Sequence, residues 1–273
     1  MDLHATRLRR VLLRLIADAR LDLSPGVLDP LLRAGRLREI EAALDRVGSR
    51  FAEEVLALYL LAAATVGRDF AGFDVTGPRV VQTLAARRQA VVASFGTEQR
   101  GMLREVLTSS VVRDESPRET ALLVWMLLGF TQRQAREFLA YRANLLQQAA
   151  GAKTRFPTKA QLTSSAVQRR VAASDALSWA EASRSVRSGE IEAYAQAVDA
   201  GLLVPEDIVQ VWRTRRDLRV RDTHRPMHGQ ERLFGVPFTS GGGASLRYPH
   251  DPLAPFSETV SCRCTVATRV SRR

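Results

Sequence analysis

The chain has 273 residues, of which 45% are hydrophobic and 25% are charged, so it is neither a disordered nor a collagen-like polypeptide. Its uncharged apolar stretch at residues 55–67 is shorter than the about 20 apolar residues that a membrane span needs. The N-terminus lacks the pattern of a secretory signal. We therefore expect a protein made in the cytoplasm, without a membrane partner.

The net charge of +11 comes almost entirely from arginine, because only Lys153 and Lys159 among the 40 basic residues are lysines. The charge is concentrated near the C-terminus, where residues 211–273 hold 12 arginines against 5 acidic residues. Basic surfaces favour polyanionic partners, since each neutralised phosphate releases counterions. Charge alone is equally compatible with a solvated surface that contacts no nucleic acid.

Apolar residues recur at helical spacing from residue 5 to about residue 200, as in the stripe formed by Leu8, Leu12, Leu15 and Ile16. Residues 116–119 have the pattern of a capping box with proline at the first helical position. Residues 131–134 resemble a second box, which opens a helix after a turn at Gly129. The inward face of this helix is predicted from its spacing to be Ala135, Phe138, Leu139, Leu145 and Leu146.

Residues 151–163 lack periodicity and predict a linker, followed by a helix over about 164–187 and another between Gly189 and Gly201. After Pro205 the sequence predicts short strands near residues 208–212 and 260–270, joined by loops rich in glycine and proline. The predicted fold is mainly α, with a multi-helix region followed by a small C-terminal α+β module. The expected domains are a helical domain (1–150), a linker with helices (151–205) and the module (206–273).

Three of the four histidines and both cysteines fall within the last fifty residues. If Asp217 caps a short helix, Arg221 and His224 lie on the same helical face, and Pro226 ends that helix near His224. His224 and His228 then cannot form the two-histidine face of a zinc hydrolase, and no glutamate stands where its general base would be. A metalloprotease is therefore not expected.

Cys262 and Cys264 project to the same side of a strand, so with His224 and either His228 or His250 they could form a tetrahedral zinc set. Val260 and Val266 lie on that same predicted face, together with the cysteines. Buried cysteines usually act as small hydrophobic side chains, and a two-residue cysteine spacing is atypical of zinc sites. We therefore expect His224, Cys262 and Cys264 to converge as a core without a metal or other cofactor.

Two further motifs have functional alternatives. The helices on either side of Gly129 could be a helix-turn-helix of a cytoplasmic DNA-binding regulator, with Arg133, Arg136 and Arg142 on the second helix. Residues 240–243, Ser-Gly-Gly-Gly, predict a hairpin turn rather than a phosphate-binding loop, because no Lys-Ser or Lys-Thr follows. An enzyme that uses a cysteine and His224 is the least favoured alternative, since no orienting group accompanies them.

The order of these C-terminal residues is similar to that of a known family. Residues 212–264 resemble the C-terminal module of the phage Mu protein F-like (MuF) minor head proteins, also called phage head morphogenesis proteins. The matching positions are Trp212, Asp217, Val220-Arg221-Asp222-Thr223-His224, Gly229-Gln230, Phe238, Gly243, Tyr248-Pro249-His250-Asp251-Pro252 and Cys262-Arg263-Cys264. Ser261 departs from the pattern, because family members often have asparagine there.

The resemblance implies a non-enzymatic minor capsid protein in the virion of a tailed bacteriophage or prophage. Such proteins are associated with the portal vertex and are linked to head morphogenesis and to genome packaging and ejection. The expected partners are the portal protein, the major capsid or scaffold protein, and double-stranded DNA bound without sequence preference. The helical domain would dock to the portal or capsid and the module would face DNA. The DNA-contact candidates are Arg213, Arg215, Arg216, Arg219 and Arg269.

Overall fold

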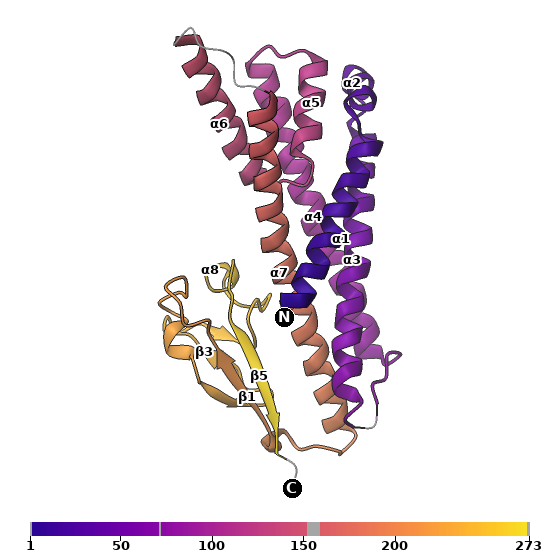
Figure 1. Ribbon diagram of the computed structural model, residues 1–273. Helices are drawn as coiled ribbons and strands as arrows, with labels where there is room; N and C mark the ends of the chain where they lie inside the picture. The colour runs from indigo at the N-terminus through magenta and orange to yellow at the C-terminus, as the bar shows by residue number, and fades with distance from the viewer. Residues whose placement is uncertain (1, 71, 152–158, 272–273) are drawn as a thin grey trace. The chain divides into compact units, whose positions relative to one another are not determined.

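The computed structural model describes residues 2–70, 72–151 and 159–271, and it consists of long helices followed by short strands (Figure 1). The helices are α1 (Asp2–Asp22), α2 (Pro25–Arg33), α3 (Leu37–Gly67), α4 (Pro78–Val112), α5 (Pro117–Leu127), α6 (Gln132–Gly151), α7 (Lys159–Asp199) and the short α8 (Phe256–Thr259). The strands are β1 (Ile208–Arg213), β2 (Glu231–Leu233), β3 (Phe238–Thr239), β4 (Ser245–Leu246) and β5 (Thr265–Val270). The predicted fold class, mainly α with a small C-terminal α+β module, is confirmed.

The two predicted capping boxes are present. At the start of α5, the Ser116 side chain accepts from the backbone N–H of Glu119, and the Glu119 carboxylate accepts from the backbone N–H of Ser116. Thr131 and Gln134 exchange the same pair of bonds before α6, at 3.2 and 2.9 Å. Both boxes satisfy backbone donors that a helix start otherwise leaves unpaired.

One long helix replaces the two helices predicted after the linker. Residues 152–158 of that linker lie outside the described residues, and α7 then runs without interruption from Lys159 to Asp199. Gly189, predicted to separate two helices, lies inside α7. A Cβ atom at this position would lie 2.3 Å from the Tyr59 carbonyl oxygen of α3, so glycine permits close packing of two helices there. Gly201, with φ +70°, follows the end of α7 as predicted.

The chain forms two compact units that are each assembled from separated segments. Unit 1 contains residues 1–6, 55–84 and 178–273, and unit 2 contains residues 7–54 and 85–177. The helical domain and the module predicted from the sequence are, by contrast, consecutive in the chain. The long helices α3, α4 and α7 each contribute residues to both units. The predicted domains, which are consecutive segments of the chain, therefore differ from the observed units.

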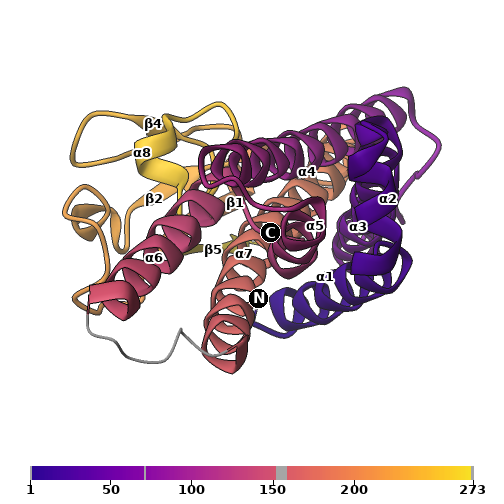
Figure 2. The ribbon, with the colours of Figure 1, turned by 90° about the horizontal axis from the view of Figure 1, so that it is seen from above.

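Unit 2 is a helical bundle with a buried apolar core. Leu8, Leu12 and Ile16 of the predicted stripe are buried there, and Leu15 is half-buried. Helix α2 packs against α5, and Figure 2 shows these two helices side by side. The turn between α5 and α6 is held by the buried Gln99 side chain, whose amide bonds the carbonyl of Phe130 and the N–H of Gly129.

The strands of unit 1 form two small sheets. In the first, β1 is the central strand and pairs antiparallel with both β2 and β5, for example through Val211 with Glu231 and with Ala267. In the second, β3 pairs with β4 around a turn at residues 240–244, so the Ser-Gly-Gly-Gly segment forms the predicted hairpin turn. Among the described residues, no helix has the length and apolarity to cross a membrane.

Substitution of Gly189 by alanine tests the close helix packing in unit 1. Alanine ordinarily stabilises a helix interior relative to glycine, but here the added methyl group would overlap the Tyr59 carbonyl oxygen. We expect Gly189→Ala to lower the free energy of unfolding by about 1–3 kcal/mol, as measured by denaturant unfolding of the full chain. Gly26→Ala in α2 is the matched control, because no atom lies within 4 Å of its added Cβ. Equal stability of the two variants would contradict the packing argument.

Candidate functional site

The centre of the C-terminal module is the buried indole of Trp212 on β1. Its ring meets the ring of Phe238 edge-on, at 5.2 Å between centroids, and Met227, Leu246, Cys262 and Cys264 belong to the same buried cluster. The Gly229 N–H donates to the Trp212 carbonyl at 2.8 Å, and Gly229 has φ +81°, a conformation that favours glycine. The chain between β1 and β2 therefore folds back against the indole.

The segment that delivers His224 is a series of turns, so the helix predicted from Asp217 is wrong. The Asp217 side chain accepts from the Arg219 N–H at 3.0 Å and pairs with Arg263 at 2.5 Å, rather than with Arg221. Pro226 lies at the start of a 3₁₀ turn, Arg225–Met227, instead of ending a helix. This placement suits proline, because the first helical positions need no N–H donor. Arg221 donates to the carbonyl of Val260.

The imidazole of His224 lies between two cysteine sulfurs and a carboxylate. Its Nδ1 atom is 3.5 Å from the Cys262 sulfur and 3.6 Å from the Cys264 sulfur. On the opposite side of the ring, Nε2 is 2.9 Å from Oε2 of Glu258, at ion-pair distance but without hydrogen-bond alignment. All four residues are buried, so the predicted convergence of His224 with both cysteines is observed.

The cysteines reach this position from a turn and not from a strand, because β5 begins only at Thr265. The strand predicted over residues 260–270 is therefore shorter than expected, and Val260 is 40% exposed instead of lying on a buried face. Ser261 has φ +52°, which reverses the chain direction just before Cys262. Asparagine adopts this left-handed conformation more readily than most residues.

The two thiols shift each other's pKa in opposite directions. A hydrogen bond from Cys264 lowers the pKa of the Cys262 thiol despite its burial, and the interaction with Cys262 together with burial raises the pKa of Cys264. The backbone N–H of Cys264 also approaches the Cys262 sulfur, at 3.5 Å. The arrangement thus favours ionisation of Cys262 over ionisation of Cys264.

The other two histidines of the module are engaged elsewhere. His228, predicted as a fourth ligand, has Nδ1 3.0 Å from the Thr214 backbone nitrogen and Nε2 3.0 Å from Nε of Arg216. Burial and the neighbouring charge of Arg216 lower the pKa of His228. The buried His250 uses Nε2 to contact the Cys262 carbonyl at 2.6 Å. The predicted four-ligand set therefore reduces to His224, Cys262 and Cys264.

The remaining motif residues have structural contacts. Asp251 is buried, and its carboxylate accepts from Arg247 through both the backbone and the guanidinium, and from the N–H of Leu253. Burial raises the pKa of Asp251, but these bonds outweigh it and hold the pKa below its usual value. The Tyr-Pro-His-Asp-Pro segment is thereby fixed beside the cysteines.

Sequence reasoning did not find Glu258, which is the buried carboxylate of the cluster. Its Oε2 accepts from the Thr223 hydroxyl at 2.9 Å, and its Oε1 accepts from the Ser240 hydroxyl at 3.2 Å. Trp179 of α7 also reaches the cluster, because its Nε1 donates to the Cys262 carbonyl at 3.0 Å. No local spacing in the sequence predicts that these residues meet the cluster, since turns and long-range packing bring them together. The one feature that could have indicated Glu258 is its position shortly before the Cys-Arg-Cys segment.

The five arginines predicted to contact DNA all have exposed side chains, but they differ in their partners. Arg269 pairs with Glu231, and the guanidinium of Arg215 lies 5.5 Å from the ring centre of Trp179. No carboxylate among the described residues forms an ion pair with Arg213 or Arg219. These two cations are the most available for phosphate.

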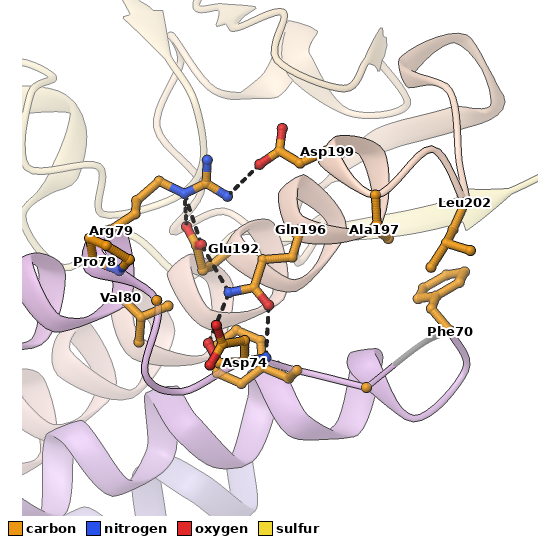
Figure 3. Close-up of a pocket in the computed structure, with 14 residues that line it drawn as sticks. Phe70, Asp74, Pro78, Arg79, Val80, Glu192, Gln196, Ala197, Asp199 and Leu202 are labelled. Atoms are coloured by element: carbon orange, nitrogen blue, oxygen red, sulfur yellow. Dashed lines mark hydrogen bonds and ion pairs between the residues drawn. The ribbon is translucent and has the colours of Figure 1, made fainter.

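Unit 1 also contains an open pocket of about 860 Å³ between the segment that follows α3 and the C-terminal part of α7 (Figure 3). Arg79 is its central cation and pairs with Glu192 and Asp199, each at 2.9 Å. Gln196 bonds the backbone N–H and carbonyl of Asp74. These charges and amides are already matched to each other, so the pocket offers no unpaired catalytic or ligand-binding group among the residues drawn.

Comparison of the chain with protein families, curated proteins and solved structures gives no match.

Proposed function

We propose that this protein is a minor head protein of a tailed bacteriophage or prophage that contacts packaged DNA without reading its sequence. The observation that carries the proposal is the pairing of a MuF-like residue pattern with an exposed, arginine-rich surface on the same module. Packaged DNA presents phosphate at every position, so nonspecific charge neutralisation suits that environment and base recognition would add nothing. The proposed location is the portal vertex of the virion.

The contacts of the motif residues support a structural rather than a catalytic role. Trp212 is a core side chain, Asp217 and Asp251 are each tied to an arginine, and Gly229 permits a turn. Each of these residues therefore has a role in holding loops together. The proposal accordingly includes no reaction.

The alternative of a helix-turn-helix regulator receives less support. Each of the three arginines predicted to read DNA from α6 has a carboxylate partner: Arg133 pairs with Glu137, Arg136 with Glu105 and Arg142 with Glu115. The Arg142 side chain is also largely buried. An arginine that is held by a carboxylate must give up that partner before it can bind a phosphate or a base.

DNA binding by the full chain tests the proposal. We expect similar affinities for random duplexes of different sequence, measured by fluorescence anisotropy, with a strong loss of affinity as salt is raised. The double variant Arg213→Gln/Arg219→Gln should reduce the slope of log K against log salt by about 1 for each phosphate that the variant no longer neutralises.

The matched control is Arg133→Gln/Arg136→Gln on α6, which should leave both affinity and slope unchanged. The regulator predicts the opposite result, in which the α6 variant loses binding to a preferred sequence and the module variant does not. A preference for one sequence that survives high salt would also contradict the proposal.

Portal docking by the helical part of the chain is tested with the portal protein of the same genome. The adjacent Val111 and Val112 at the end of α4 are 81% and 80% exposed, and burial of one valine side chain contributes about 1.5 kcal/mol. We expect Val111→Ser/Val112→Ser to weaken portal binding at least about tenfold in a pull-down titration. Leu253→Ser, at a residue 80% exposed on the module, is the control. Loss of binding in the control variant alone would place the docking surface on the module.

A further inference from the structure

The donor atoms of His224, Cys262 and Cys264 already have the spacing of a tetrahedral metal site. With Zn–S distances of about 2.3 Å and Zn–N distances of about 2.0–2.1 Å, ligand sulfur and nitrogen atoms in such a site lie about 3.5–3.6 Å apart. The His224 Nδ1 atom lies 3.5 and 3.6 Å from the two sulfurs, and all three donor atoms lie within 4.8 Å of one another. Both nitrogen–sulfur distances therefore match those of a tetrahedral zinc site.

The groups behind the imidazole direct its lone pair toward the sulfurs. The negative charge of Glu258 beside Nε2 favours the tautomer with the proton on Nε2, which leaves the Nδ1 lone pair facing Cys262 and Cys264. Hydroxyl bonds from Thr223 and Ser240 hold that carboxylate in place. A carboxylate that orients the second nitrogen of a histidine is the usual outer shell of a metal-bound imidazole.

The contacts of the sulfurs also suit thiolates. The Cys264 N–H approaches the Cys262 sulfur at 3.5 Å. N–H donors directed at sulfur stabilise its negative charge.

A small cavity lies beside the three donors. It has a volume of about 10 Å³, enough for about one water molecule. Its lining includes Arg219, Arg221, Ser261 and Arg263 in addition to the three donor residues. A fourth ligand from solvent can therefore complete a tetrahedron that the protein leaves open on one side.

We propose that His224, Cys262 and Cys264 bind one zinc ion through Nδ1 and two sulfurs, with water from the adjacent cavity as the fourth ligand. Two thiolates neutralise the charge of a divalent zinc ion, so the ion and its direct protein ligands together carry no net charge. Thiolate and imidazole ligands in a tetrahedral arrangement select zinc over magnesium or calcium, which prefer oxygen ligands. The ion joins the loop that carries His224 to the loop before β5.

The test uses the full chain, purified without a metal-affinity tag or chelator. We expect about one zinc ion per chain by elemental analysis, and an X-ray absorption spectrum with two sulfur neighbours at about 2.3 Å and nitrogen or oxygen neighbours at about 2.0–2.1 Å. Zinc-depleted protein titrated with Co²⁺ should show sulfur-to-cobalt charge-transfer absorption. Protein without zinc that gives no such absorption with Co²⁺ would overturn the proposal.

Three variants locate the site. Cys264→Ser should remove the charge-transfer signal expected for two thiolates, and His228→Gln should retain full zinc content, because His228 lies outside the cluster. Glu258→Gln preserves the size of the side chain but removes the charge beside Nε2, and should weaken zinc affinity about 10- to 100-fold. Unchanged zinc affinity in Glu258→Gln, or loss of zinc in His228→Gln, would contradict the assignment. The Co²⁺ titration of the unsubstituted protein tests the proposal even if Cys264→Ser fails to fold.

Discussion

The C-terminal module depends on the buried imidazole of His224, which contacts two cysteine sulfurs on one side and the Glu258 carboxylate on the other. The strands of the module contain only two to six residues, so their backbone ladders hold little of the chain in place. The loops must therefore be fixed by side chains. His224 is edge-on to the indole of Trp212, at 5.6 Å between ring centres, which connects the polar cluster to the apolar one.

Because side chains must fix the loops, several positions of the module require a particular residue type. Gly229 allows a return turn against Trp212, Asp217 ties the His224 loop to Arg263, and Asp251 orders the segment that carries His250. The positively charged residues occupy the exposed positions that remain, among them Arg213 and Arg219. In the proposed function, the buried residues of the module hold its loops in place. The exposed arginines contact DNA through their charge.

The sequence predicted those parts of the fold that local chemistry determines. The capping boxes before α5 and α6, the position of β1 and the hairpin turn at residues 240–243 each follow from short-range patterns, and each is confirmed. Gly189 was misinterpreted, because the close approach of α3 that requires a glycine is a long-range contact. The division of the chain into units could not be read from the order of its segments for the same reason.

The site was predicted in part. The convergence of His224, Cys262 and Cys264 was expected, but through a helix and a strand, whereas turns at residues 217–224 and a left-handed Ser261 produce it. The sequence offers either His228 or His250 as the second imidazole, and the structure directs His228 to Thr214 and Arg216. Glu258 was missed because only tertiary structure places its carboxylate behind the imidazole. The charge of the module was visible in its composition, but the partners of individual arginines were not.

Hydrogen–deuterium exchange of the full chain, measured with zinc and after treatment with a chelator, tests most directly whether the proposed zinc site at His224 holds the module together. We predict that removal of the ion increases exchange in residues 214–230 and 256–264, while the helices of unit 2 keep their protection. Equal exchange in the two loops with and without the ion would contradict this role of the cluster, as would a loss of protection spread evenly over the chain.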